Sequence, residues 1–162
     1  METFEPDVRR YRLILLACGL SALIVPAAFV VLALLDVVAP TGIDALVPAL
    51  FAYAIGQLPV FVVVRSALRR QAFEALRSAD PAAGAASGDA VLQYLRKMTL
   101  FIALDAEALA VAGGIVFLLT REWISLTTIA AALVMIVAGF PTRDRWAAAA
   151  ARLREAGGVI GA

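Results

Sequence analysis

The sequence predicts an all-α integral membrane protein: a bundle of four transmembrane helices with both termini inside the cell and short cytoplasmic helical extensions. Of the 162 residues, 63% are hydrophobic and only 17% are charged, against about 25% charged residues in an ordinary soluble domain. The charges also cluster, leaving apolar stretches of about 20 residues, enough for a helix to cross a bilayer. None of these stretches alternates with period two, so membrane barrel strands are not predicted.

The four predicted spans are residues 10–36, 44–78, 89–120 and 122–141. The first has arginines in front of it, as a signal peptide would. Its apolar run is longer than a signal core, however, and no small-residue cleavage site follows, so we expect a retained helix. Pro40 and Gly42 mark the first loop, and Pro141 ends the fourth span. Gly113 and Gly114 predict a point of close helix packing in the third span.

The parts outside the spans are small, so all 162 residues are predicted to form a single membrane domain. Residues 79–88, rich in alanine, glycine and serine, predict a flexible cytoplasmic linker between the second and third helices. Asp89 is a suitable N-cap for the third helix. Residues 143–156 predict an amphipathic C-terminal helix, with Trp146, Ala150 and Leu153 on one face.

The orientation follows from the basic residues. All but one of the 14 lie in the N-terminal segment, in the loop between the second and third spans, or in the C-terminal tail. Because basic residues stay inside, both termini and this loop are predicted to be cytoplasmic. Arg121 alone falls on the outer side. With the high alanine content, this predicts a multi-pass protein of a bacterial inner membrane.

The C-terminal helix has two interpretations. Its basic and aromatic side chains are candidates for contact with an anionic lipid surface: Arg145, Trp146, Arg152 and Arg154. The alternative is that these arginines only enforce the topology.

Two carboxylates interrupt the third span. Glu107 lies ~14 Å along the helix from Met98, and Asp105 lies two residues earlier. Two residues correspond to ~200° around a helix, so the carboxyls point in nearly opposite directions and cannot chelate one ion. Glu107 shares its face with small residues, which predicts a buried helix contact. These are Ala103, Ala110 and Gly114.

The second span offers polar partners at a matching depth. Gln57 lies ~10 Å and Tyr53 ~17 Å from Val64 along the helix, so both are predicted partners of Glu107. Glu107 is then either a proton-accepting carboxylate or a protonated group that joins two helices by hydrogen bonds. Cys18 and Ser21 in the first span are interpreted as small packing residues.

The function is predicted from what the residues allow. With no histidine and one cysteine, we expect no zinc or other metal site, no cofactor and no enzyme activity. The net charge of +1 predicts no nucleic-acid binding. We expect a small accessory or scaffold subunit that contacts the lipid bilayer and a protein partner or a second copy of itself. The alternative is a proton- or cation-handling membrane protein, a transporter or channel component, that uses Glu107.

Overall fold

The computed structural model describes residues 5–78 and 84–159, and within them all regular structure is helical. Five α-helices and one 3-10 turn follow in order: α1 (Glu5–Leu34), α2 (Leu46–Ser78), α3 (Gly84–Thr120), η1 (Trp123–Leu126), α4 (Thr127–Ala138) and α5 (Arg143–Val159). The predicted linker at 79–88 is wrong for residues 84–88, which form the first turns of α3. Ala85 and Ala86 are strong helix formers, and α3 begins at Gly84, on the N-terminal side of the predicted cap Asp89. Residues 79–83 lie outside the described residues.

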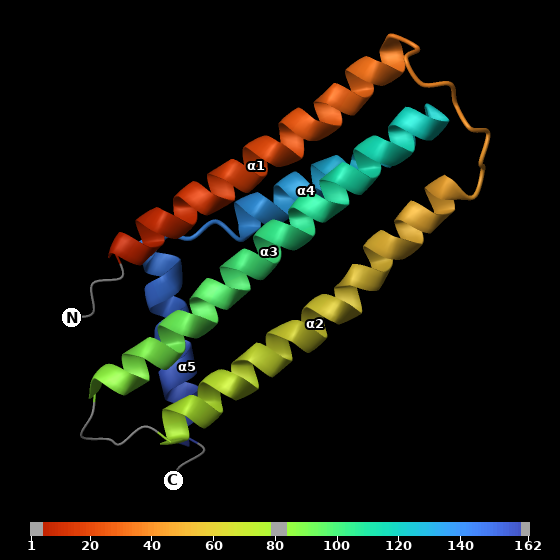
Figure 1. Ribbon diagram of the computed structural model, residues 1–162. Helices are drawn as coiled ribbons and strands as arrows, with labels where there is room; N and C mark the ends of the chain where they lie inside the picture. The colour runs from red at the N-terminus through yellow and green to blue at the C-terminus, as the bar shows by residue number, and fades with distance from the viewer. Residues whose placement is uncertain (1–4, 79–83, 160–162) are drawn as a thin grey trace.

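The helix α3 lies at the centre of the bundle (Figure 1). Its most apolar stretch is 50% buried inside the molecule, compared with 17% for α1 and 6% for α2. The helices α1 and α4 pack on one side of α3, and α2 lies on the other side. A bilayer provides no hydrophobic driving force between helices, so close packing must hold them together.

Small residues provide this packing. The core between α1, α3 and α4 is built largely from alanines, with a few larger side chains: Leu15, Ala22, Ala103, Ala106, Leu109, Ala110, Ala132 and Ile136. A Cβ on Gly114 would come within 2.9 Å of the backbone of Pro26 in α1, and one on Gly113 would collide with Thr128 in α4. The predicted close-packing point at Gly113 and Gly114 is therefore confirmed.

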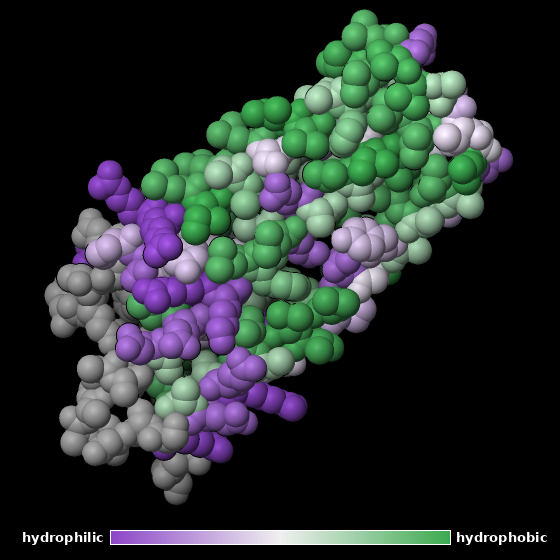
Figure 2. Space-filling model, in the orientation of Figure 1, coloured by the Kyte–Doolittle hydropathy of each residue, from purple (hydrophilic) through white to green (hydrophobic). Residues whose placement is uncertain are grey.

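The two ends of the bundle differ in polarity. We call the end formed by residues 5–12, 65–78, 84–97 and 143–159 the terminal end, and the end formed by residues 35–45 and 121–126 the loop end. Figure 2 shows hydrophilic side chains gathered at the terminal end, while hydrophobic side chains cover most of the rest of the face in view. This polarity is consistent with a membrane protein.

Three helices are long and apolar enough to cross a membrane: Pro6–Leu34, Leu46–Arg77 and Asp89–Thr120. A fourth span exists only if Trp123–Ala138 and Arg143–Leu153 count as one, and these two segments bend by 74° at their junction. The predicted span 122–141 is thus shorter than expected. Its 3-10 turn and twelve-residue helix extend about 26 Å, less than a ~30 Å hydrocarbon core.

Candidate functional site

The Glu107 carboxyl lies between α1 and α3. The face of α3 that carries it is confirmed as a close helix contact, because Ala103 and Ala110 are almost fully buried and Gly114 touches α1. Ser21 Oγ of α1 donates a hydrogen bond of 2.5 Å to Glu107 Oε1. Cys18, one turn earlier in α1, also interacts with this carboxyl. Spaced three residues apart, Cys18 and Ser21 lie on the same face of α1.

The predicted partners of Glu107 are wrong. Gln57 and Tyr53 belong to α2, which lies on the opposite side of α3, and Ser21 takes the place assigned to them. Ser21 and Cys18, interpreted from the sequence as packing residues, are the polar neighbours of the carboxyl. The sequence did contain a signal for this partner, because Ser21 is a polar residue of α1 at the depth of Glu107. The O···O distance is in the range of strong hydrogen bonds to a carboxyl group, so the pair joins α1 to α3.

Asp105 lies on the face of α3 toward α2. The rings of Phe101 and Phe61 stack with centroids 5.9 Å apart, which turns the Phe101 face of α3 toward α2. Asp105 follows Phe101 by one turn, and Gln57 precedes Phe61 by one turn in the antiparallel α2. Asp105, rather than Glu107, therefore shares a level with Gln57. Within the described residues neither side chain forms a hydrogen bond, and neither does the side chain of Tyr53, which is 40% exposed.

Glu107→Gln is expected to leave stability nearly unchanged, because the amide oxygen still accepts the bond from Ser21. Glu107→Ala is expected to lower the free energy of unfolding by about 1–3 kcal/mol, since it leaves the Ser21 hydroxyl unpaired in a packed contact. Denaturation of the purified protein in detergent measures both. Asp105→Asn, at a site without a hydrogen bond, is the control and should change stability less. An equal loss for Glu107→Gln and Glu107→Ala would contradict the hydrogen-bonded junction.

The apolar face of α5 packs against the chain itself. Trp146, Ala150 and Leu153 are buried in a cluster at the terminal end, which also contains Val8, Tyr11, Val91 and Leu95. The Trp146 ring lies 5.8 Å from the ring of Tyr11, between centroids. The lipid-surface interpretation of Trp146 is therefore corrected: the face that would enter a lipid surface is covered by α1, α2 and α3.

The arginines of α5 differ in what they contact. Arg145 Nη1 donates to the last carbonyls of α4 and its junction, those of Val137, Ala138 and Phe140, at 3.1–3.5 Å. Arg12 Nε donates to the Pro141 carbonyl at 2.9 Å. Cations there complement the negative end of the α4 dipole and satisfy its free carbonyls. Arg152 is exposed and lines a pocket, while the side chain of Arg154 lies outside the described residues.

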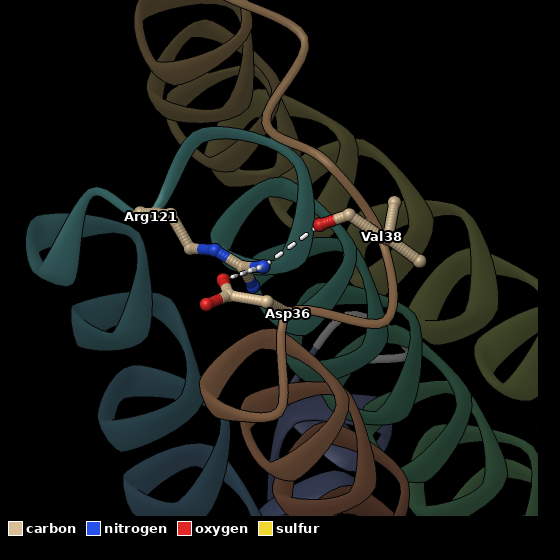
Figure 3. A network of polar contacts seen from close by, with 3 residues as sticks. All are labelled: Asp36, Val38 and Arg121. Atoms are coloured by element: carbon tan, nitrogen blue, oxygen red, sulfur yellow. Dashed lines mark hydrogen bonds and ion pairs between the residues drawn. The ribbon is translucent and has the colours of Figure 1, made fainter.

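At the loop end, Arg121 holds two loops together (Figure 3). Its Nη2 donates to the Val38 carbonyl at 2.8 Å and lies 3.4 Å from Asp36 Oδ1. Thr41 N donates to the Leu119 carbonyl at 2.9 Å and adds a second connection. Basic residues are rare in loops on the outer side of a membrane, where the sequence places Arg121. Its isolated position there was the sequence signal for these contacts.

Neither end shows a metal-binding arrangement: among the described residues no group of three or more Cys, Asp or Glu side chains could hold an ion. The fold defines the class of the protein, an all-helical chain with three to four membrane-length apolar helices. No protein-family model matches the chain, and no curated protein or solved structure matches it either.

Proposed function

We propose that the protein is a small integral-membrane accessory or scaffold subunit that acts through protein and lipid contacts. The observation that supports this function is the exposed apolar surface of α2. Only 6% of its most apolar stretch is buried inside the molecule, and most apolar side chains there are exposed, while Ala54 and Phe61 are among those that are half-buried. Ile55, Leu58, Val62 and Val63 are each more than 60% exposed.

The exposed part of α2 also suits a partner helix. A Cβ placed on Gly56 meets no atom within 4 Å, so the backbone is open to close approach at that point. Small residues at such points let transmembrane helices pack tightly. At its terminal end α2 is held by Ala72, Phe73 and Leu76, so a partner could cover the apolar part without displacing the helix.

Photo-crosslinking in the native membrane tests this function. A crosslinking amino acid at Ile55 or Val62 of α2 should give discrete protein adducts, from a partner or a second copy. The matched control is Ile24 of α1, which is 63% exposed, and there only lipid adducts are expected. Lipid adducts alone at all three positions would overturn the scaffold function, because α2 would then face only the bilayer.

The orientation that goes with this function has the terminal end in the cytoplasm of a bacterial cell, with the protein in the inner membrane. All but one of the 14 basic residues lie at that end, and the exception is Arg121. With Cys18 replaced by serine, a cysteine at position 44 should react with a membrane-impermeant maleimide in intact spheroplasts. A cysteine at position 84 should react only after permeabilisation. Labelling of position 84 in intact spheroplasts would reverse the orientation.

A second candidate function, proton or cation handling, is favoured by the two half-buried carboxyls in the apolar stretch of α3. Intramembrane carboxylates commonly mark ion pathways. In proteoliposomes under a pH gradient, this function predicts proton flux that Glu107→Gln abolishes while Asp105→Asn retains most of it. The scaffold function predicts the same passive leak for all three proteins.

A further inference from the structure

A pocket of about 270 Å³ opens at the terminal end between α2, α3 and α5. Three arginines line it: Arg65 and Arg69 from α2, and Arg152 from α5. Tyr94 of α3 forms part of its wall, and Ala149 and Leu153 of α5 supply an apolar side.

The fold holds these arginines together. Arg65 and Arg69 are four residues apart and therefore lie on one face of α2. Arg152 reaches the pocket because the neighbouring Leu153 is buried in the cluster that docks α5. The bend of 74° that follows α4 places α5 across the ends of the other helices. Three positively charged side chains thus line one pocket that is built from elements far apart in the sequence.

Among the described residues, no carboxylate forms an ion pair with any of the three guanidinium groups. The ion pairs of the described residues are Asp7–Arg96 and Asp36–Arg121, and neither involves the pocket. The Arg69 guanidinium lies 5.2 Å from the centre of the Phe73 ring, a contact that leaves its charge unpaired. Like charges that converge without a counter-charge repel each other, so an anion in the pocket would be favoured.

The chemistry of the pocket selects the kind of anion. Guanidinium groups present planar pairs of N–H donors that match the oxygens of a phosphate group. Arg65 directly follows the apolar run of residues 61–64 in α2. In a membrane this level corresponds to the lipid headgroups, where basic pockets between helices bind anionic lipids.

We propose that the pocket formed by Arg65, Arg69, Arg152 and Tyr94 is a binding site for a phosphate group, carried either by an anionic phospholipid or by a soluble phosphate compound. The site is separate from the apolar part of α2 on which the proposed scaffold function rests. Either can therefore fail without the other.

The test uses the full chain, purified in detergent, with two probes. Phosphatidylglycerol binding is measured by native mass spectrometry against zwitterionic phosphatidylcholine, and pyrophosphate binding is measured by titration calorimetry. The variant Arg65→Gln/Arg152→Gln removes two of the pocket charges. The control Arg70→Gln/Arg143→Gln removes two charges from the same helices outside the pocket.

We expect the pocket variant to weaken binding by on the order of 30-fold, and the control by much less. Preferential binding of phosphatidylglycerol with no pyrophosphate binding identifies a lipid headgroup site. Pyrophosphate binding that the pocket variant loses identifies a soluble ligand. Binding of neither probe, or an equal loss in both variants, would overturn the assignment. None of these outcomes bears on the crosslinking test of the scaffold function, which probes a different part of α2.

Discussion

Replacing Trp146 with alanine is expected to lower the free energy of unfolding by about 3–5 kcal/mol, the range for truncating a buried tryptophan. Trp146 is 5% exposed and packs on Tyr11 within the cluster that attaches α5 to the bundle. The cluster lies at the terminal end, where the hydrophilic side chains gather, and removing apolar surface from water is the main favourable contribution to folding. Denaturation in detergent measures the loss. Trypsin cleavage at Arg152 should accelerate, because α5 detaches.

Trp123 provides the matched control. It is 64% exposed, although its ring lies 4.9 Å from that of Phe117, between centroids. Trp123→Ala should therefore cost much less stability than Trp146→Ala and should leave cleavage of α5 unchanged. Equal losses for the two variants would show that the cluster around Trp146 does not hold α5 in place.

Gly114→Ala is expected to destabilise the bundle by about 1–3 kcal/mol, the usual cost of adding a methyl group to a packed contact. The new Cβ would lie 2.9 Å from Pro26 Cα, and a backbone atom cannot move away as a flexible side chain can. Gly113→Ala should have a similar effect against η1 and α4, because the new Cβ would lie 2.9 Å from the Ser125 carbonyl oxygen and would collide with Thr128. The measurement is the unfolding midpoint in detergent.

Gly56→Ala is the control for both glycines. Its Cβ meets no atom within 4 Å, and alanine favours a helix over glycine by up to ~1 kcal/mol. Stability should therefore stay equal or rise. A loss at Gly56 as large as that at Gly114 would mean that glycine is needed for another reason than close helix approach. In the native membrane, the same substitution also tests whether a partner packs on α2.

The sequence predicted the long helices because its apolar runs are long and, apart from Asp105 and Glu107, free of charged residues. Most predicted boundaries lie within a few residues of the observed ones. The sequence also placed Glu107 on the correct face, since Ala103, Ala110 and Gly114 leave room for a neighbouring helix. The neighbour itself was wrong. Distance along a helix gives the depth of a residue but not which helix faces it. By depth alone, Gln57 and Ser21 are both possible partners of Glu107, and the packing of α1 against its face of α3 makes Ser21 the partner.

The tail could not be settled from its pattern for a related reason. A helix that lies on lipid and a helix that docks on its own chain both need one apolar face, so Trp146, Ala150 and Leu153 predict either equally well. The choice depends on apolar residues from distant segments, such as Val8 and Val91, which meet only in three dimensions. The pocket lined by Arg65, Arg69 and Arg152 arises from the same docking.

The cluster at the terminal end has a consequence for biosynthesis. It joins Val8 of α1 to Leu153 of α5, so its members are synthesised at widely separated times. The cluster therefore cannot close while the earlier helices are being synthesised, and Val91 and Leu95 lack their contacts with α5 until α5 is complete. A chain truncated after Pro141 would keep its apolar helices but present this open surface to chaperones and proteases. Docking of α5 thus comes after the four preceding α-helices have been synthesised.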